Sequence, residues 1–175
     1  MKVLATILVL IVSPLLSASW SETETVAIGL EACVSYRAKL AGGYLIVEAT
    51  PQDGWHTFAM DNELRSTEAL AGKMSLGVDG PTEISVSGGA KVAAGWLQSE
   101  PEDYSKPELR WYSWGYEQPA IFAAKVEGGG PAVVAVRGQT CSEDKCKNVE
   151  IELAVPASGD SFKPDLSGLV PVRTR

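Results

Sequence analysis

The chain has 175 residues, 45% of them hydrophobic and 21% charged, and its 22 acidic side chains outnumber 15 basic ones, giving a formal net charge of −7 at pH 7. This acidic balance argues against nucleic acid and anionic membrane surfaces as partners. The length suits one domain with a full hydrophobic core, and no segment beyond the N-terminal leader is long and apolar enough to span a membrane.

Residues 1–19 have the features of a secretory signal peptide. Lys2 precedes an apolar run, and small residues at 17–19 follow Pro14. The run is shorter than the roughly 20 residues that span a bilayer, and Pro14 interrupts it, which argues against an uncleaved anchor. We therefore expect a mature chain that begins near Trp20, has a net charge of −8 once Lys2 is lost, and is periplasmic or otherwise exported.

Two strand-like segments early in the mature chain predict a β-hairpin. Residues 34–40 alternate between apolar and polar side chains, residues 44–50 have the composition of a second strand, and an Ala-Gly-Gly turn separates them. The segment 61–70 is the one plausible helix, with Asp61 or Asn62 able to cap its N-terminus. We expect this helix to be a short crossover in a β-rich chain.

Four later segments have the composition of strands: 83–87, 120–126, 132–138 and 149–155. A Gly-Gly pair follows the first and a Gly-Gly-Gly-Pro run follows the second, which predicts a turn at each place. About seven to nine short strands separated by turns are typical of an all-β antiparallel sandwich, which we place at 20–156. The polar segment 157–175 is expected to be a flexible C-terminal tail.

The stretch 101–118 is unusually rich in aromatic residues for a loop, and it contains Tyr104, Trp111, Tyr112, Trp114 and Tyr116. Long ordered loops in compact domains are often binding or lid segments. Alternatively, the aromatic side chains belong to a strand whose alternate faces pack on the core. The sequence leaves both interpretations open.

The three cysteines of the chain predict one disulfide and one free thiol. Cys141 and Cys146 flank a polar four-residue loop between two strands, so they face each other across a hairpin with Cα atoms about 4.5–5.5 Å apart, within reach of a disulfide. Cys33 lies in a predicted buried strand and is expected to pack as a small hydrophobic residue. A disulfide at a hairpin tip can be a structural staple or a reactive pair, and its spacing does not decide between them.

Charged and metal-binding residues near the pair give weaker signals. Lys145 and Lys147 flank Cys146 and favour its thiolate, whereas the acidic residues of the loop oppose this effect. His56 is the only histidine, and with Trp55 beside it we expect a packed strand residue. The scattered soft ligands lack the spacing of a copper site, so we predict neither a metal nor a cofactor.

Two motifs together resemble the N-terminal periplasmic domain of the thiol:disulfide interchange protein DsbD, the "disulfide bond corrector" family. They are Gly54-Trp55-His56 and the Cys141-x4-Cys146 pair near the turn before the last strand, and the resemblance covers 34–156. It implies an immunoglobulin-like sandwich whose cysteine pair, matched by Cys141 and Cys146, is redox-active. It also implies a cap loop over the pair, which falls at 104–116. Many relatives have proline after the second cysteine, whereas this chain has Lys147.

The resemblance implies a stand-alone thiol–disulfide interchange module. Such a module would receive electrons from a thioredoxin-like or membrane electron-carrier protein and pass them through Cys141 and Cys146 to exported thiol proteins. The alternative is a non-catalytic sandwich that binds a protein partner, with the disulfide bracing a hairpin. These two hypotheses differ in whether the pair exchanges with other thiols under conditions that leave the domain folded.

Overall fold

The structure is a computed structural model that describes residues 19–75, 79–158 and 163–175. The predicted signal peptide therefore lies outside the described residues except for Ser19. Within the described ranges, no helix has the length and hydropathy needed to cross a membrane.

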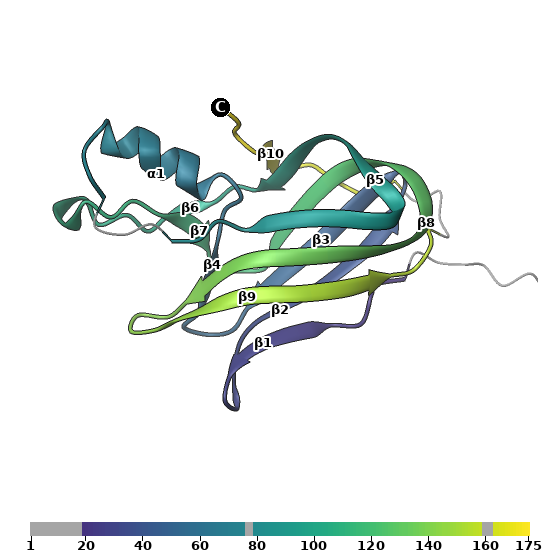
Figure 1. Ribbon diagram of the computed structural model, residues 1–175, viewed down its shortest axis with the longest axis horizontal. Helices are drawn as coiled ribbons and strands as arrows, with labels where there is room; N and C mark the ends of the chain where they lie inside the picture. Colours follow the sequence, from purple (N-terminus) through teal and green to yellow (C-terminus); the bar gives the residue numbers. More distant parts are fainter. Residues whose placement is uncertain (1–18, 76–78, 159–162) are drawn as a thin grey trace, which may run out of the picture.

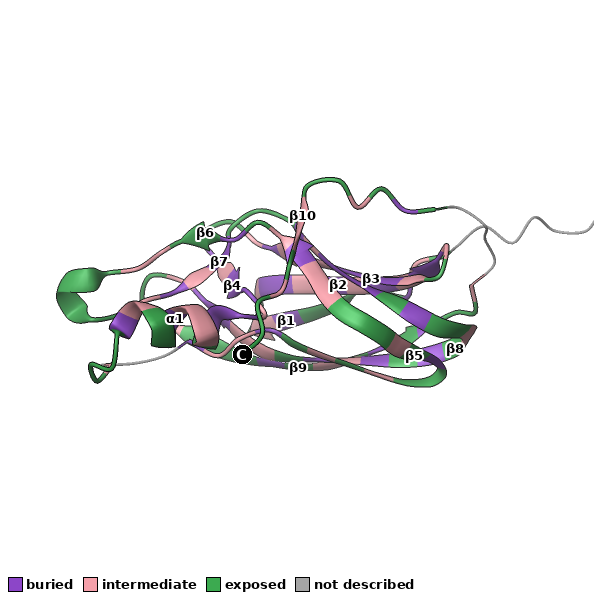
Figure 2. Cartoon of the chain, turned by 90° about the horizontal axis from the view of Figure 1, so that it is seen from above, coloured by how far each residue is buried: buried purple, intermediate pink, exposed green. Residues whose placement is uncertain are grey.

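The described residues form an all-β antiparallel sandwich with one short α-helix at one end (Figures 1 and 2). The elements, in chain order, are β1 (Glu24–Ile28), β2 (Glu31–Ala41), β3 (Tyr44–Pro51), β4 (His56–Phe58), α1 (Asn62–Leu70), β5 (Glu83–Ser99), β6 (Glu102–Asp103), the 3₁₀ helix η1 (Pro107–Leu109), β7 (Trp114–Tyr116), β8 (Ala120–Cys141), β9 (Cys146–Val155) and β10 (Leu169–Pro171). The immunoglobulin-like sandwich expected from the sequence is confirmed, as are the hairpin of β2 and β3 and the helix after β4.

Strand β8 belongs to both layers of the sandwich. Its first part pairs with β3, from Ala120 opposite Ala49 to Lys125 opposite Tyr44. Its second part pairs with β9 on one side, while β5 and then β4 pair on the other. The last part of β5 also pairs with the first part of β8, and β10 pairs with β5 there. One layer therefore runs from β1 through β2, β3 and the first part of β8 to the last part of β5 and β10. The other contains β9, the second part of β8, the first part of β5, β4, β7 and β6 (Figure 1).

The glycine-rich turns expected at 88–89 and 128–131 are wrong, because β5 and β8 both continue through these positions. The glycines instead allow two paired strands to bend together into the second layer. A Cβ on Gly128, which has φ +84°, would lie 2.4 Å from the carbonyl oxygen of Gly89. A Cβ on Gly89 would lie 2.6 Å from the backbone of Gly130. Side chains at these positions would prevent the close approach of the two backbones.

The inner faces of the two layers share one hydrophobic core. Its largest fully buried apolar side chains come from β2, β3, β4, β8 and β9, and they include Tyr36, Leu45, Phe58, Phe122 and Leu153. Burying an apolar side chain of this size stabilises the fold by about 1.5–3 kcal/mol relative to leaving it exposed. We therefore expect the fold to remain stable when the hairpin disulfide is reduced.

The C-terminal segment differs from the flexible tail expected at 157–175. Leu169–Pro171 forms β10 and pairs with β5, with Leu169 opposite Ser99. The backbone N–H of Arg173 donates to Oδ2 of the buried Asp61 at 3.0 Å, and its guanidinium pairs with Glu68 of α1. The polar composition of the segment does not predict these contacts. A strand edge and a buried carboxylate can hold a short segment in place even when it has little apolar surface.

Candidate functional site

The candidate site lies where β8 ends and β9 begins. Cys141 and Cys146 are directly opposed in the ladder and form a disulfide, with Cα atoms 4.0 Å apart. The loop between them is closed by a hydrogen bond from the N–H of Ser142 to the carbonyl oxygen of Lys145 at 2.8 Å. Cys33 is free and buried, so the predicted connectivity is the one in the structure.

The two cysteines of the pair differ in exposure. Cys141 is 3% exposed, whereas Cys146 is exposed on the outer side of the hairpin. A disulfide exchange begins with attack of a thiolate along a clear approach to one sulfur. In this arrangement, Cys146 is the residue that an outside thiol can reach.

A chain of buried hydroxyl groups fixes the end of β8 against β4. Cys141 is opposite His56, and Oγ1 of Thr140 donates to the carbonyl oxygen of His56 at 2.9 Å. Oγ1 of Thr57 donates to the carbonyl oxygen of Gln139 at 3.2 Å and also contacts the Tyr36 hydroxyl at 3.2 Å. These bonds hold the backbone of Cys141 in place independently of the disulfide.

His56 is a packed aromatic residue beside the pair, as the sequence predicts. Its ring stacks on Tyr104 with centroids 5.3 Å apart and meets Phe58 edge-on at 5.1 Å. Burial lowers the pKa of the imidazole, although the nearby carboxylates of Asp79 and Glu117 oppose this effect. The lowered pKa favours the neutral form of the imidazole beside Cys141.

On the other side of the hairpin, Glu31 joins Lys145 to Trp55. Its Oε2 lies 2.6 Å from Nζ of Lys145, and its Oε1 accepts a hydrogen bond from Nε1 of Trp55 at 3.0 Å. The Lys145 ammonium also lies 5.6 Å from the centre of the Trp55 ring. The hydrogen bond with Lys145, and then that with Trp55, lowers the pKa of Glu31, and Glu31 in turn raises the pKa of Lys145.

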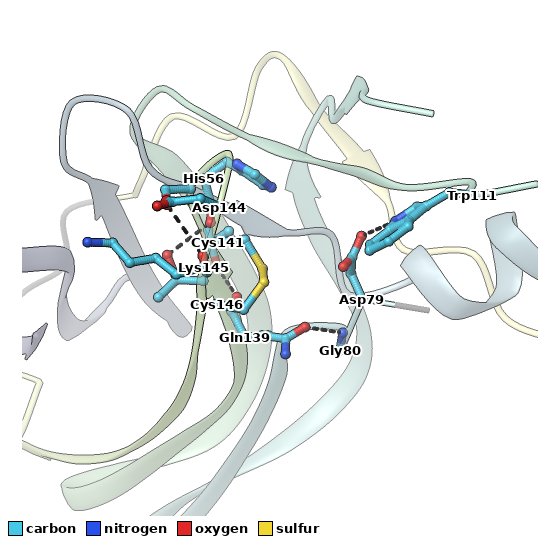
Figure 3. The surroundings of a disulfide bond; sticks show 12 residues. His56, Asp79, Gly80, Trp111, Gln139, Cys141, Asp144, Lys145 and Cys146 are labelled. Carbon is cyan, nitrogen blue, oxygen red and sulfur yellow. Dashed lines mark hydrogen bonds between the residues drawn. A yellow bond between two sulfur atoms is a disulfide. The ribbon is translucent and has the colours of Figure 1, made fainter. Parts of the chain in front are cut away.

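Figure 3 shows the Lys145 side chain directed away from the two sulfur atoms. The sequence suggested that Lys145 and Lys147 would both act on Cys146. The charge of Lys145 is paired with Glu31 instead. Sequence reasoning missed Glu31 because 114 positions separate it from Lys145, and no motif marks it.

The aromatic stretch combines both interpretations offered by the sequence. Trp114 and Tyr116 lie on β7 and pack against the core, and the Tyr116 hydroxyl donates to the carbonyl oxygen of Ser99 at 2.8 Å. Tyr104 stacks on His56 beside the pair. Trp111 is 37% exposed, and its Nε1 donates to Oδ2 of Asp79 at 2.8 Å.

The structure therefore does not gather the five aromatic residues over the disulfide. Tyr104 is connected to the pair through His56, and its hydroxyl donates to Glu102 at 3.1 Å. Trp111 lies across Asp79 from the disulfide (Figure 3). Tyr112 is half-buried and lies in sequence between the exposed Trp111 and the core residue Trp114.

No protein-family model matches the chain, and no curated protein matches it in sequence. In structure, the chain is similar to the N-terminal periplasmic domain of ScsB from Proteus mirabilis, with a TM-score of 0.55, 15% identity, and coverage of 81% of this chain and 54% of that one. The chain thus spans about half the length of the ScsB structure. It is also similar to the N-terminal domain of DsbD from Neisseria meningitidis in the reduced form, with a TM-score of 0.48, 14% identity, and coverage of 80% and 90%.

The similarity to the ScsB domain shows a shared fold. This is in line with the domain fold expected from Gly54-Trp55-His56 and the Cys141-x4-Cys146 pair. An identity of 15% does not transfer an activity.

Proposed function

We propose that the protein is an exported thiol–disulfide interchange module that passes electrons through Cys141 and Cys146. The observation that carries the proposal is the asymmetry of the pair, with Cys146 exposed and Cys141 only 3% exposed at a hairpin that the core holds in place. The sulfur of Cys146 is then available for attack. The sulfur of Cys141 is the leaving group, and hydrogen bonds hold the backbone of Cys141 in place. The ScsB-like fold is consistent with this role.

The proposed exchange consumes one dithiol and one disulfide. A thiolate of a thioredoxin-like or membrane electron-carrier protein attacks Sγ of Cys146, the Cys141–Cys146 bond breaks, and Cys141 leaves as a thiolate that takes up a proton. The second thiol of the partner, as its thiolate, attacks the partner sulfur in this mixed disulfide and releases Cys146. The partner is oxidised by two electrons, and the reduced pair can then reduce the disulfide of an exported protein by the same steps in reverse order.

Surrounding residues have distinct tasks in this scheme. Thr140 and Thr57 hold the end of β8 while the disulfide opens, because their hydrogen bonds do not pass through either sulfur. Tyr104 and neutral His56 cover the side of the pair that faces β4, which limits the approach of oxidants from that direction. No step requires a metal or an organic cofactor.

The alternative function is a non-catalytic sandwich whose disulfide braces the hairpin. The pairing of Glu31 with Lys145, which also ties the hairpin loop to the start of β2, favours this view because it adds a second brace. Closing so short a loop contributes only about 2 kcal/mol by chain entropy. A large core is not expected to need that contribution.

The reduction potential of the pair tests the proposal. In redox buffers of glutathione, the pair should titrate at a potential above the roughly −300 mV below which structural disulfides resist reduction. The reduced domain should keep its circular dichroism spectrum. A lower potential would leave the bracing function in place.

Trapping of a mixed disulfide provides the second arm of the test. Cys141→Ser, with Cys146 first converted to its mixed disulfide with thionitrobenzoate, should react with a thioredoxin variant that lacks its resolving cysteine. The thioredoxin thiolate displaces thionitrobenzoate, and the protein–protein mixed disulfide accumulates because no second thiol can resolve it. Cys146→Ser is the matched control and should trap much less, because Cys141 is buried. Equal trapping by both variants would contradict the assignment of Cys146 as the attacked residue.

A further inference from the structure

Most of the large exposed hydrophobic side chains lie toward the end of the molecule that carries the disulfide. Among the described residues these are Leu30, Met74, Leu109 and Trp111, whereas Val133, also exposed, lies on β8 just after the bend. The turn between β1 and β2, the η1 segment and the β8–β9 hairpin all lie toward the same end, whereas β8 bends at the opposite end (Figure 1). Exposed apolar groups gathered in one region are typical of protein interaction sites.

Leu30 lies near the disulfide because the next residue in sequence, Glu31, contacts the disulfide loop. It is fully exposed at a tight turn, directly after Gly29, which has φ +61°. The next residue, Glu31, binds Lys145 at 2.6 Å, and Lys145 directly precedes Cys146. The turn and the disulfide loop are therefore held against each other.

The η1 side is joined to the pair by a second set of contacts. Nε1 of Trp111 donates to Asp79, and the N–H of the next residue, Gly80, donates to the side-chain oxygen of Gln139 at 3.2 Å. Gln139 precedes Cys141 by two positions on β8. In Figure 3 the disulfide lies between Lys145 on one side and Trp111 on the other.

The η1 tip is ordered although its apolar side chains face water. The N–H of Lys106 donates to the carbonyl oxygen of Trp111 at 2.7 Å, and the reverse bond is 3.2 Å long. Oγ of Ser75, next to Met74, donates to the carbonyl oxygen of Arg110 at 3.5 Å. A partner that binds such a preformed surface loses less conformational entropy than one that must order a loop.

The charge of the η1 tip is opposite to that of the whole protein. Lys73, Lys106 and Arg110 are exposed around Met74 and Leu109, with Glu108 as the acidic residue within η1. The chain as a whole has a net charge of −7. Electrostatic complementarity therefore favours a partner with an acidic margin on the side that meets η1, whereas the disulfide loop itself has the exposed acidic residues Glu143 and Asp144.

We infer that Leu30 on one side, and Met74, Leu109 and Trp111 on the other, form one docking surface for a thioredoxin-like protein with an acidic margin, whose reactive cysteine reaches Cys146 between them. This inference rests on the proposed interchange function and names the partner class and the residues that select it. The docking surface acts on association with a protein and leaves the intrinsic reactivity of the disulfide unchanged.

Reduction by a protein and by a small thiol separates these effects. Reduced bacterial thioredoxin serves as the protein probe and dithiothreitol as the small reductant, with the second-order rate constant measured by tryptophan fluorescence. Leu30→Ser and the double variant Met74→Ser/Leu109→Ser should each slow reduction by thioredoxin about fivefold or more, as expected for removal of apolar anchors. The rate with dithiothreitol should stay as in the wild type.

Val133→Ser is the matched control, because Val133 is 39% exposed and lies on the second part of β8, after the bend. It should leave both rates unchanged.

Arg110→Glu should slow reduction by thioredoxin at low salt, with the difference shrinking as salt screens the charge. Unchanged thioredoxin rates in the Leu30 and Met74/Leu109 variants, or an equal loss with dithiothreitol, would overturn the docking surface. A wild type that dithiothreitol reduces and thioredoxin does not would instead overturn the proposed function, and the docking surface with it.

Discussion

Cys33 illustrates how the surroundings of a single residue decide its chemistry. It is fully buried on β2, and its Sγ donates to the carbonyl oxygen of Glu31 at 3.6 Å. Burial is the main cause that raises the pKa of the Cys33 thiol, so little thiolate is present at neutral pH. Two of the three cysteines thus form the disulfide, and the third acts as a core residue.

Glu31 provides a prediction at the same scale. Glu31→Gln keeps an oxygen for Nε1 of Trp55 but removes the charge that is paired with Lys145. The released positive charge near the reduced pair should stabilise thiolates and make the reduction potential less negative, by about 10–20 mV. Redox titration against glutathione measures the shift.

The control for this variant is Glu150→Gln. Glu150 forms an exposed ion pair with Arg137 on the same hairpin, with the charged atoms 3.6 Å apart and no contact with the loop between the cysteines. Its potential should match that of the wild type. A shift of the same size in both variants would mean that total charge, and not the Lys145 contact, sets the potential.

At the scale of elements, Asp61 connects three parts of the fold. Its carboxylate accepts hydrogen bonds from Nε of Arg65 on α1 at 2.8 Å, from the side-chain amide of Gln98 on β5 at 2.8 Å, and from the N–H of Arg173 at 3.0 Å. Burial by itself raises the pKa of Asp61, but these hydrogen bonds, led by that from Arg65, outweigh it and the pKa is lowered. The sequence suggested a helix cap at Asp61, yet this side chain makes no capping hydrogen bond.

Asp61→Asn should therefore destabilise the fold at neutral pH. The amide keeps one acceptor oxygen, but its NH₂ group faces an N–H donor or a guanidinium and cannot accept a hydrogen bond. We expect this change to lower the free energy of unfolding by about 2–4 kcal/mol, measured in urea titrations. Because the folded pKa is lowered, the contribution of Asp61 is complete above the ordinary pKa of aspartate and is lost as the pH falls through the folded value. The difference between variant and wild type should thus be constant above about pH 5 and shrink below about pH 4.

Glu48→Gln is the comparison for this experiment. Glu48 pairs with Arg37 at 2.8 Å across β2 and β3, where both side chains are partly exposed. Exposed pairs of this kind contribute about 0–1 kcal/mol. A cost for Asp61→Asn no larger than that for Glu48→Gln would contradict the role of Asp61 as a buried junction.

At the scale of the whole molecule, the bend of β5 and β8 determines the position of the disulfide. The first part of β8 pairs with β3, and only after the bend does the strand reach β4 and the disulfide. The bend therefore carries Cys141 from one layer to the end of the other. It also brings β9 into the second layer, where its inner residues Val149, Leu153 and Val155 complete the core.

Gly128→Ala tests this bend. Its Cβ would lie 2.4 Å from the carbonyl oxygen of Gly89, and its φ of +84° is unfavourable for alanine. We expect a loss of about 2–4 kcal/mol in the free energy of unfolding, measured in urea.

Gly43→Ala is the matched control because Gly43 has a similar φ of +79° but nothing within 4 Å of its Cβ position. It should cost only about 1–2 kcal/mol, the penalty of the backbone conformation alone. Equal losses in the two variants would mean that the close approach of the two strands does not limit the bend.

The local features of this protein follow from its sequence alone. The alternation at 34–40, the strand composition of 44–50 and the Ala-Gly-Gly turn between them determine the β2–β3 hairpin. The polar loop between Cys141 and Cys146 determines their opposition, because residues joined by a short loop are neighbours in space. The sandwich class follows from the number and spacing of such segments. These inferences need no knowledge of how distant parts of the chain meet.

Only the tertiary structure decided which distant residues surround the disulfide. Glu31 reaches Lys145 across 114 positions, and the aromatic stretch divides between the core at Tyr116 and the His56 side of the pair at Tyr104. The glycine-rich segments were ambiguous because glycine permits both a tight turn and a close crossing of two strands. The docking of β10 depends on a strand edge and on the buried Asp61, neither of which the local composition records. Long-range packing selects among alternatives that local sequence allows equally.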